Sequence, residues 1–190
     1  MNIIIVALGT IPNFLSDCVE QIKITQKNPT IHIIKNKTSI YKNNNCIIVD
    51  VENIPLSQKH LNFLKKSELI NKNFRNYFWR YSSERLYVID DYLQMQNLRD
   101  VIHIETDVLL YQDLEVILPT LQNFDFACVR DNQIRVIGSI LYIKNKNISG
   151  KISSIANDYI NENDMIILNH VAKKIENVYY FPTGDQAFYK

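Results

Sequence analysis

Glycine is scarce in this chain. Only 4 of its 190 residues are glycine, and no glycine-rich phosphate loop, GxGxxG pattern or GxSxG pattern occurs. These patterns bring the backbone or the nucleophile to the substrate in P-loop kinases, dinucleotide-dependent dehydrogenases and serine hydrolases. The sequence therefore disfavours all three classes of enzyme.

Cysteine is also scarce, and its spacing is unlike that of a metal or redox motif. The chain has three cysteines, Cys18, Cys46 and Cys128, with no CxxC pair. Cys46 and Cys128 lie in apolar runs, where a free thiol behaves as a small hydrophobic side chain. We therefore expect a reducing compartment and a cytoplasmic protein.

Long hydrophobic segments and basic runs are both missing. The apolar start, Met1 to Leu8, is too short for a transmembrane helix and lacks the basic region and cleavage site of a signal peptide. A formal net charge of +1 without a basic run gives no electrostatic footprint for nucleic acid. The sequence predicts no transmembrane segment and no nucleic-acid partner, and it does not specify an oligomeric state.

The rest of the composition is ordinary for a folded domain, with 46% hydrophobic and 22% charged residues. A chain of 190 residues can bury a core of its own. No repeat, low-complexity segment or linker divides it, so we expect a single domain over residues 1–190. Lys190 follows soon after the segment Tyr179 to Gln186, which leaves open that this is the N-terminal part of a longer protein.

The most informative segment is an apolar run that ends in two carboxylates. Val101 to Ile104 is followed by Glu105, Thr106 and Asp107. In a strand, side chains two residues apart point to the same face, so Glu105 and Asp107 are expected to converge where the strand meets solvent. Two like charges this close favour a cation between them, and oxygen ligands suit Mg²⁺ or Mn²⁺. Such an ion would naturally carry a diphosphate.

Apolar runs and helical spacing alternate along the chain. Strands are predicted over Ile3–Ala7, Thr30–Ile34, Cys46–Val49, Val101–Glu105, Phe126–Val129 and Val136–Lys144. Helices are predicted over Phe14–Gln26, Ser57–Lys66, Ser83–Asn97, Asp113–Gln122, Lys151–Asn161 and Asp164–Ile175, with Ser82 or Ser83 as a cap and an irregular segment over Ile70–Arg80. This alternation predicts an α/β three-layer sandwich with a mostly parallel central sheet, in which ligands bind beyond the carboxyl ends of the strands. Gly138 and Ser139 mark a close approach of the backbone to a ligand.

Four segments together resemble glycosyltransferases of the GT-A fold: Arg80, Ser83–Leu86, Val101–Val108 and Asn163–Met165. The Glu-Thr-Asp triplet resembles the DxD motif, which in that superfamily holds Mn²⁺ or Mg²⁺ on the two phosphates of a nucleotide sugar, usually a UDP-sugar. Glu105 departs from the motif's first aspartate, so Asp107 is the stronger candidate metal ligand and Glu105 the second. The histidine motif that completes the metal site in many retaining members has no match here. Of the chain's own histidines, His103 alternates with Glu105 and is interpreted as structural.

The resemblance also implies a binding site for the nucleotide base. Leu8, Gly9 and Thr10 follow the first strand, where the superfamily contacts the base; an ordinary strand-to-helix turn is the alternative. Asp50 is a candidate acceptor for the uracil N–H, with a helix cap or a solvated carboxylate as its alternative.

Two arginines and one aspartate are candidates for the donor side and for catalysis. Arg80 and Arg85 suit phosphate oxygens or sugar hydroxyls, and at least one is expected to bind the donor; pairing with neighbouring acids is the alternative for Arg85. Asp164 is the candidate base that deprotonates the acceptor, with Asp185 as its competitor and a helix cap as its structural alternative. In retaining relatives a similarly placed acid binds sugar hydroxyls instead.

The resulting prediction is a metal-dependent glycosyltransferase that moves a sugar from a nucleotide donor to a hydroxyl on a glycan, lipid or protein. A non-catalytic nucleotide-sugar or glycan-binding module of the same fold is the main alternative. A nucleotidyltransferase or metal phosphohydrolase is a third, because these enzymes also combine carboxylates with a metal. The loop Leu8–Pro12 lacks the glycine-rich, basic character of nucleotidyltransferase phosphate loops.

Overall fold

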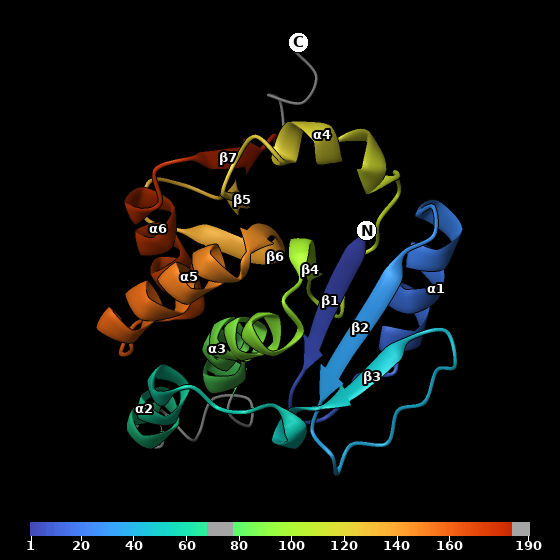
Figure 1. Cartoon of the computed structure of the whole chain (residues 1–190), viewed down its shortest axis with the longest axis horizontal. Coiled ribbons are helices and arrows are strands. Elements are labelled where there is room, and N and C mark those ends of the chain that lie inside the picture. Colours follow the sequence, from blue (N-terminus) through green and yellow to red (C-terminus); the bar gives the residue numbers. More distant parts are fainter. Residues whose placement is uncertain (68–77, 184–190) are drawn as a thin grey trace.

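The computed structural model describes residues 1–67 and 78–183, and a seven-stranded sheet runs through this part of the chain (Figure 1). Its strands are β1 (Asn2–Ala7), β2 (Thr30–Lys35), β3 (Ile47–Asp50), β4 (Arg99–Ile104), β5 (Phe126–Arg130), β6 (Val136–Asn145) and β7 (Val178–Phe181). The helices are α1 (Leu15–Thr25), α2 (Gln58–Ser67), α3 (Phe78–Gln96), α4 (Leu118–Leu121), α5 (Lys146–Asp158) and α6 (Asp164–Lys174), with short 3₁₀ turns at Val51–Asn53 and Leu114–Val116.

The sheet is mostly parallel, as predicted. Its order is β3-β2-β1-β4-β6-β5-β7, and β6 runs antiparallel to both of its neighbours, β4 and β5. The pairs β1–β2, β1–β4, β2–β3 and β5–β7 are parallel. The carboxyl ends of β1, β2 and β4 therefore meet at one edge of the sheet.

Helices cover both faces of the sheet, which confirms the three-layer sandwich. Ile4 of β1 packs into a core with residues of α2, α3, α5 and α6. Its neighbours Ile3 and Ile5 point the other way, into a second core with residues of α1 and α4. This alternation explains why β1 is apolar from Ile3 to Ala7: both of its faces are buried.

Three predicted helices have different boundaries. α3 already includes Phe78, so Ser82 and Ser83 lie inside it; the Ser82 hydroxyl donates to the Phe78 carbonyl at 2.9 Å instead of capping. The predicted helix over 113–122 is broken into a 3₁₀ turn and α4, where Pro119 removes a backbone donor. α5 begins at Lys146 because Asn145 accepts from the backbone N–H groups of residues 147 and 148.

Two other expectations need comment. β7 was not predicted; it is a short, half-buried strand that pairs with β5. The part of the predicted irregular segment up to residue 77 lies outside the described residues, and Phe78 to Arg80 is helical. Within the described part of the chain, no helix is long and apolar enough to cross a membrane.

Buried charges fix α3 to its neighbours. His60 of α2 is 1% exposed, and its Nδ1 lies 2.7 Å from Asp91 Oδ2 while its Nε2 lies 3.6 Å from Glu84 Oε1. Asp90, also on α3, accepts hydrogen bonds from Ser149 and Ser153 of α5. Burial lowers the pKa of His60, but the two carboxylates outweigh it and raise this pKa to about 8.

This pKa predicts a loss of stability in mild alkali. A protonated His60 stabilises the fold fully below its unfolded pKa of 6.5, and this contribution disappears as the pH rises through about 8. The free energy of unfolding, measured with urea, should fall by about 2 kcal/mol between pH 6.5 and pH 9. His60→Gln should flatten this pH dependence. An unchanged wild-type stability across the interval would contradict the assignment.

Candidate functional site

A cavity of about 380 Å³, here called the central cavity, opens at the carboxyl ends of β1 and β4. Leu8 and Thr10 line it from the segment after β1, and Glu105 and Asp107 line it from the segment after β4. Arg85 of α3 forms part of its wall. The structure thus brings together the predicted acidic pair, part of the first loop and one of the two predicted arginines.

Glu105 and Asp107 line the same cavity, but not because they alternate along a strand as the sequence suggested. β4 ends at Ile104, so Glu105 and Asp107 lie on a turn, in which the Val108 N–H donates to the Glu105 carbonyl at 3.3 Å. Strand alternation therefore does not apply to them. Asp107 is exposed, and within the described residues its carboxylate has no hydrogen-bonding or ion-pair partner.

Arg85 joins the two halves of the site. Its Nη1 donates to Glu105 Oε1 and its Nη2 donates to Asp164 Oδ2 at 2.6 Å. The Arg85 side chain is only 7% exposed. A Cβ atom at Gly138 would collide with Nη2, so the close approach predicted at this glycine is made to Arg85. The alternative of an intrahelical ion pair does not describe Arg85, whose partners come from other segments.

Asp164 is a buried carboxylate at the start of α6. Burial raises its pKa, with a further contribution from the negative charge of Glu105, while Arg85 and nearby backbone N–H groups oppose the rise. The N-cap is Asn163, whose Oδ1 accepts from the Ile166 N–H at 3.1 Å. Capping alone therefore does not account for Asp164. A raised pKa brings a carboxylate closer to the range of a general base.

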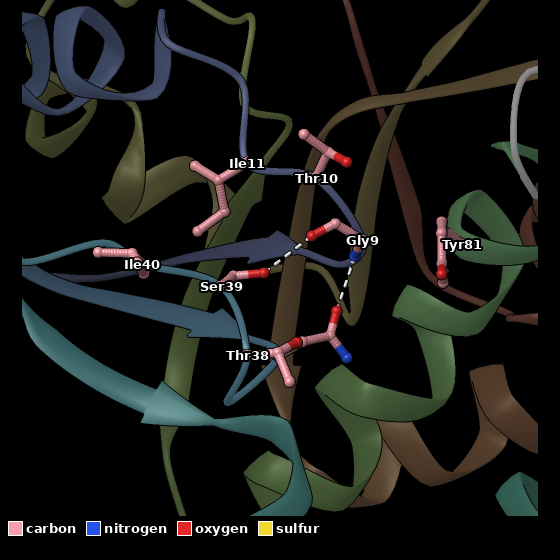
Figure 2. A pocket seen from close by; sticks show the side chains of 8 residues that line it. Gly9, Thr10, Ile11, Thr38, Ser39, Ile40 and Tyr81 are labelled. Carbon is pink, nitrogen blue, oxygen red and sulfur yellow. Dashed lines mark hydrogen bonds between the residues drawn. The ribbon is translucent and has the colours of Figure 1, made fainter.

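The first loop borders a second, larger cavity of about 700 Å³, here called the outer cavity (Figure 2). Gly9 has a φ of +78°, and a Cβ atom there would lie 2.7 Å from the Tyr81 ring. Its N–H donates to Asn36 Oδ1 at 2.7 Å, and its carbonyl accepts from the Ser39 hydroxyl at 2.9 Å. Gly9 thus forms both a turn with the positive φ that glycine adopts readily and part of the cavity wall, and Figure 2 shows it between Ser39 and Tyr81.

The sequence analysis missed the polar side of the outer cavity. Asn36, Thr38 and Ser39 follow β2 and line this cavity together with Gly9 and Thr10. A signal was present: a polar segment directly after a buried parallel strand lies at the same sheet edge as the segments after β1 and β4. Tyr81 of α3, which no sequence pattern singled out, lines both cavities.

Three predicted site residues, Asp50, Arg80 and Asp164, line neither the central nor the outer cavity. Asp50 forms an ion pair with Lys35 at 2.7 Å and lines neither cavity. Arg80 Nε lies 3.4 Å from Glu84 Oε2 on the same helix, and Arg80 lines a separate cavity of about 270 Å³. The competitor Asp185 lies outside the described residues.

The carboxylate oxygens at the central cavity suit a hard divalent ion whose other ligands come from the substrate. Among the described residues, no group of three His, Cys, Asp or Glu side chains is placed to hold a metal. Mg²⁺, however, is usually bound by one or two carboxylates, with phosphates and water completing its coordination. Asp107 and the oxygen of Glu105 that is not bonded to Arg85 would supply these one or two carboxylate ligands.

Gly138→Ala tests the seating of Arg85. The added methyl group should displace the guanidinium and lower the free energy of unfolding by about 1–3 kcal/mol in urea titrations. Gly150→Ala is the matched control: the nearest atom to its Cβ is Gln94 Nε2 at 3.5 Å, and alanine in α5 should stabilise by up to about 1 kcal/mol. Equal effects of the two substitutions would show that Arg85 is not held against Gly138.

Comparison with known proteins finds solved structures with a similar fold. No protein-family model and no curated protein matches the chain. Solved structures do: galactosyltransferase LgtC in complex with donor and acceptor sugar analogs has a TM-score of 0.62 at 15% identity, over 95% of this chain and 73% of LgtC. PaToxG glycosyltransferase has a TM-score of 0.56 at 13% identity, over 90% of this chain and 63% of that chain.

Glycosyltransferase GlyE of Streptococcus pneumoniae TIGR4 has a TM-score of 0.55 at 14% identity, over 93% of this chain and 44% of that chain. The chain thus spans less than two thirds of PaToxG and less than half of GlyE. At these identities the comparison concerns architecture. The chain shares its fold with these solved glycosyltransferases.

Proposed function

We propose that this protein is a glycosyltransferase that moves a sugar from a nucleotide donor, a UDP-sugar, to a hydroxyl on a glycan, lipid or protein. The observation that carries the proposal is the Arg85 bridge between Glu105 and Asp164, which lies beside the exposed Asp107. It occurs at the sheet edge where α/β folds bind ligands, in a fold shared with glycosyltransferases. LgtC was solved with donor and acceptor sugar analogs, which supports these classes of partner.

The central cavity has the charges that a leaving nucleoside diphosphate requires. Asp107 and Glu105 would hold Mn²⁺ or Mg²⁺, and the bound ion would act as a Lewis acid that stabilises negative charge on the diphosphate. The Arg85 guanidinium adds a permanent positive charge at the wall of the same cavity. The nucleoside would extend into the outer cavity, where Gly9, Thr10 and the polar residues after β2 provide hydrogen-bonding groups.

Asp164 has the environment of a proton acceptor. Its buried carboxylate is fixed by Arg85 Nη2 at 2.6 Å, and its pKa is raised by burial. We assign it the removal of the proton from the acceptor hydroxyl, whose oxygen then attacks the anomeric carbon. Hydrogen bonding to sugar hydroxyls is its alternative role within the same function.

A non-catalytic nucleotide-sugar-binding module is the second candidate. It is favoured by the pairing of Glu105 with Arg85, which leaves Asp107 as the carboxylate in the central cavity with no partner in the described residues. Thermal unfolding with a panel of nucleotides and nucleotide sugars, each with and without Mn²⁺, tests binding, because a ligand specific for the native state raises Tm. A Mn²⁺-dependent shift with UDP, followed by hydrolysis or transfer of the matching sugar, supports the enzyme. Binding without turnover supports the module, and no shift with any nucleotide contradicts both.

Asp107→Ala should abolish the Mn²⁺-dependent part of nucleotide binding and leave Tm without ligand nearly unchanged. The side chain is exposed and has no partner in the described residues, so its removal costs little packing. Glu115→Ala, which removes another exposed carboxylate of the neighbouring segment, is the control and should bind UDP and Mn²⁺ like wild type. Undiminished binding by Asp107→Ala would refute the metal assignment.

Asp164→Asn should lower kcat by about a hundredfold or more while the Kd for the donor changes little, since a positioned base acts in the chemical step. Steady-state transfer assays combined with calorimetric donor titrations measure the two effects separately. Asp158→Asn removes an exposed carboxylate near the end of α5 and should have normal kcat. A normal kcat for Asp164→Asn would assign the base to another residue.

A further inference from the structure

We propose that Arg85 keeps free divalent metal ions out of the central cavity, so that metal enters only together with a diphosphate. This inference rests on the proposed function, because it concerns how the same cavity is loaded. The structure shows one guanidinium paired with two carboxylates, Glu105 and Asp164, whose negative charge it offsets in part, beside a third carboxylate, Asp107. Without Arg85, the two acids that line the cavity, Glu105 and Asp107, would have no positive charge between them and the buried Asp164.

The Arg85 guanidinium is held firmly in this position. Its side chain is 7% exposed, and two different carboxylates each accept from one of its terminal nitrogens. The backbone at Gly138 leaves no room for a methyl group beside the guanidinium. A Cβ atom at Gly138 would also lie 3.1 Å from the Leu168 side chain. A guanidinium does not lose its proton under physiological conditions, so its positive charge stays in place.

This fixed charge weakens the site for a metal ion alone. It repels any second cation near Glu105, and it occupies one oxygen of that carboxylate. The free ion would then depend mainly on the exposed Asp107, although hard cations need several oxygen ligands. The pairing with Arg85 thus makes Glu105 a poor ligand until additional negative charge arrives.

A diphosphate supplies what the protein lacks. Its oxygens complete the coordination of the ion, and its negative charge offsets the repulsion from Arg85. Metal and nucleotide should therefore strengthen each other's binding by the same factor, because coupling between two ligands is reciprocal. Arg85 sets this coupling: it attracts the phosphate and repels the free ion.

Mn²⁺ binding measured by electron paramagnetic resonance tests this inference independently of turnover. For the wild-type chain, saturating UDP should lower the Kd for Mn²⁺ at least tenfold. Arg85→Met, which keeps an unbranched side chain and removes the charged guanidinium, should bind Mn²⁺ without UDP at least tenfold more tightly than wild type. Adding Asp107→Asn to Arg85→Met should abolish this gain.

Two controls separate charge from shape. Arg85→Lys retains a positive charge and should bind Mn²⁺ alone as weakly as wild type. Arg135→Met removes an exposed arginine that pairs with Asp131 in a surface turn, and should also behave like wild type. Circular dichroism establishes that each variant is folded. If Arg85→Met does not fold, the wild-type titration with and without UDP decides the question.

The outcomes distinguish this inference from the proposed function. Mn²⁺ binding by the wild-type chain that is equally tight with and without UDP overturns the inference but leaves a metal-dependent transferase intact. The same holds if Arg85→Met binds free Mn²⁺ no more tightly than wild type. If neither protein binds Mn²⁺ even with UDP, both the inference and the metal-dependent function are wrong.

Discussion

The Arg85 guanidinium, bound by Glu105 on one side and Asp164 on the other, is the interaction on which the site depends. It joins α3 to the turn after β4 and to the start of α6. Glu105 is 20 residues from Arg85 along the chain, and Asp164 is 79 residues from it. The carboxylates of Glu105 and Asp164 offset the cost of burying this guanidinium, and loss of either partner would leave the remaining buried charge less well compensated. The small residue at Gly138 is the condition for this packing.

The rest of the structure holds α3 where Arg85 can make these contacts. His60 and Asp90 connect α3 to α2 and α5 through buried charges and hydroxyl groups. On the other side, Tyr81 of the same helix packs beside the Gly9 turn that follows β1. One helix thus links the interior charge network to both cavities, and the exposed Asp107 is left facing the solvent-accessible part of the site. The site thus combines a group of paired charges, Arg85 with Glu105 and Asp164, with one exposed carboxylate, Asp107, that has no partner in the described residues.

The sequence was most informative where the local pattern decides the structure. Continuous apolar runs identified six of the strands, because strands buried on both faces need apolar residues at every position. The acidic pair was predicted for the same kind of reason, as polar residues at the end of an apolar run, whereas Asp164 was predicted from the resemblance to glycosyltransferases. Long-range partners were not predictable. The sequence around Asp50 does not indicate its ion pair with Lys35, and the sequence around Gly138 does not indicate that the Arg85 guanidinium packs against it. β7 was missed because a four-residue, half-buried strand gives only a weak alternating signal.

The proposed function requires that the cavity beside Arg85, Glu105 and Asp107 receives the diphosphate of a nucleotide sugar. A crystal structure of the chain with UDP and Mn²⁺ tests this requirement, because the anomalous signal locates the ion. We expect the ion between Asp107 and the phosphate oxygens, with Arg85 still in contact with Asp164 and the nucleoside in the cavity beside Gly9. A nucleotide bound away from this sheet edge, or an ion that does not contact Asp107, would contradict it.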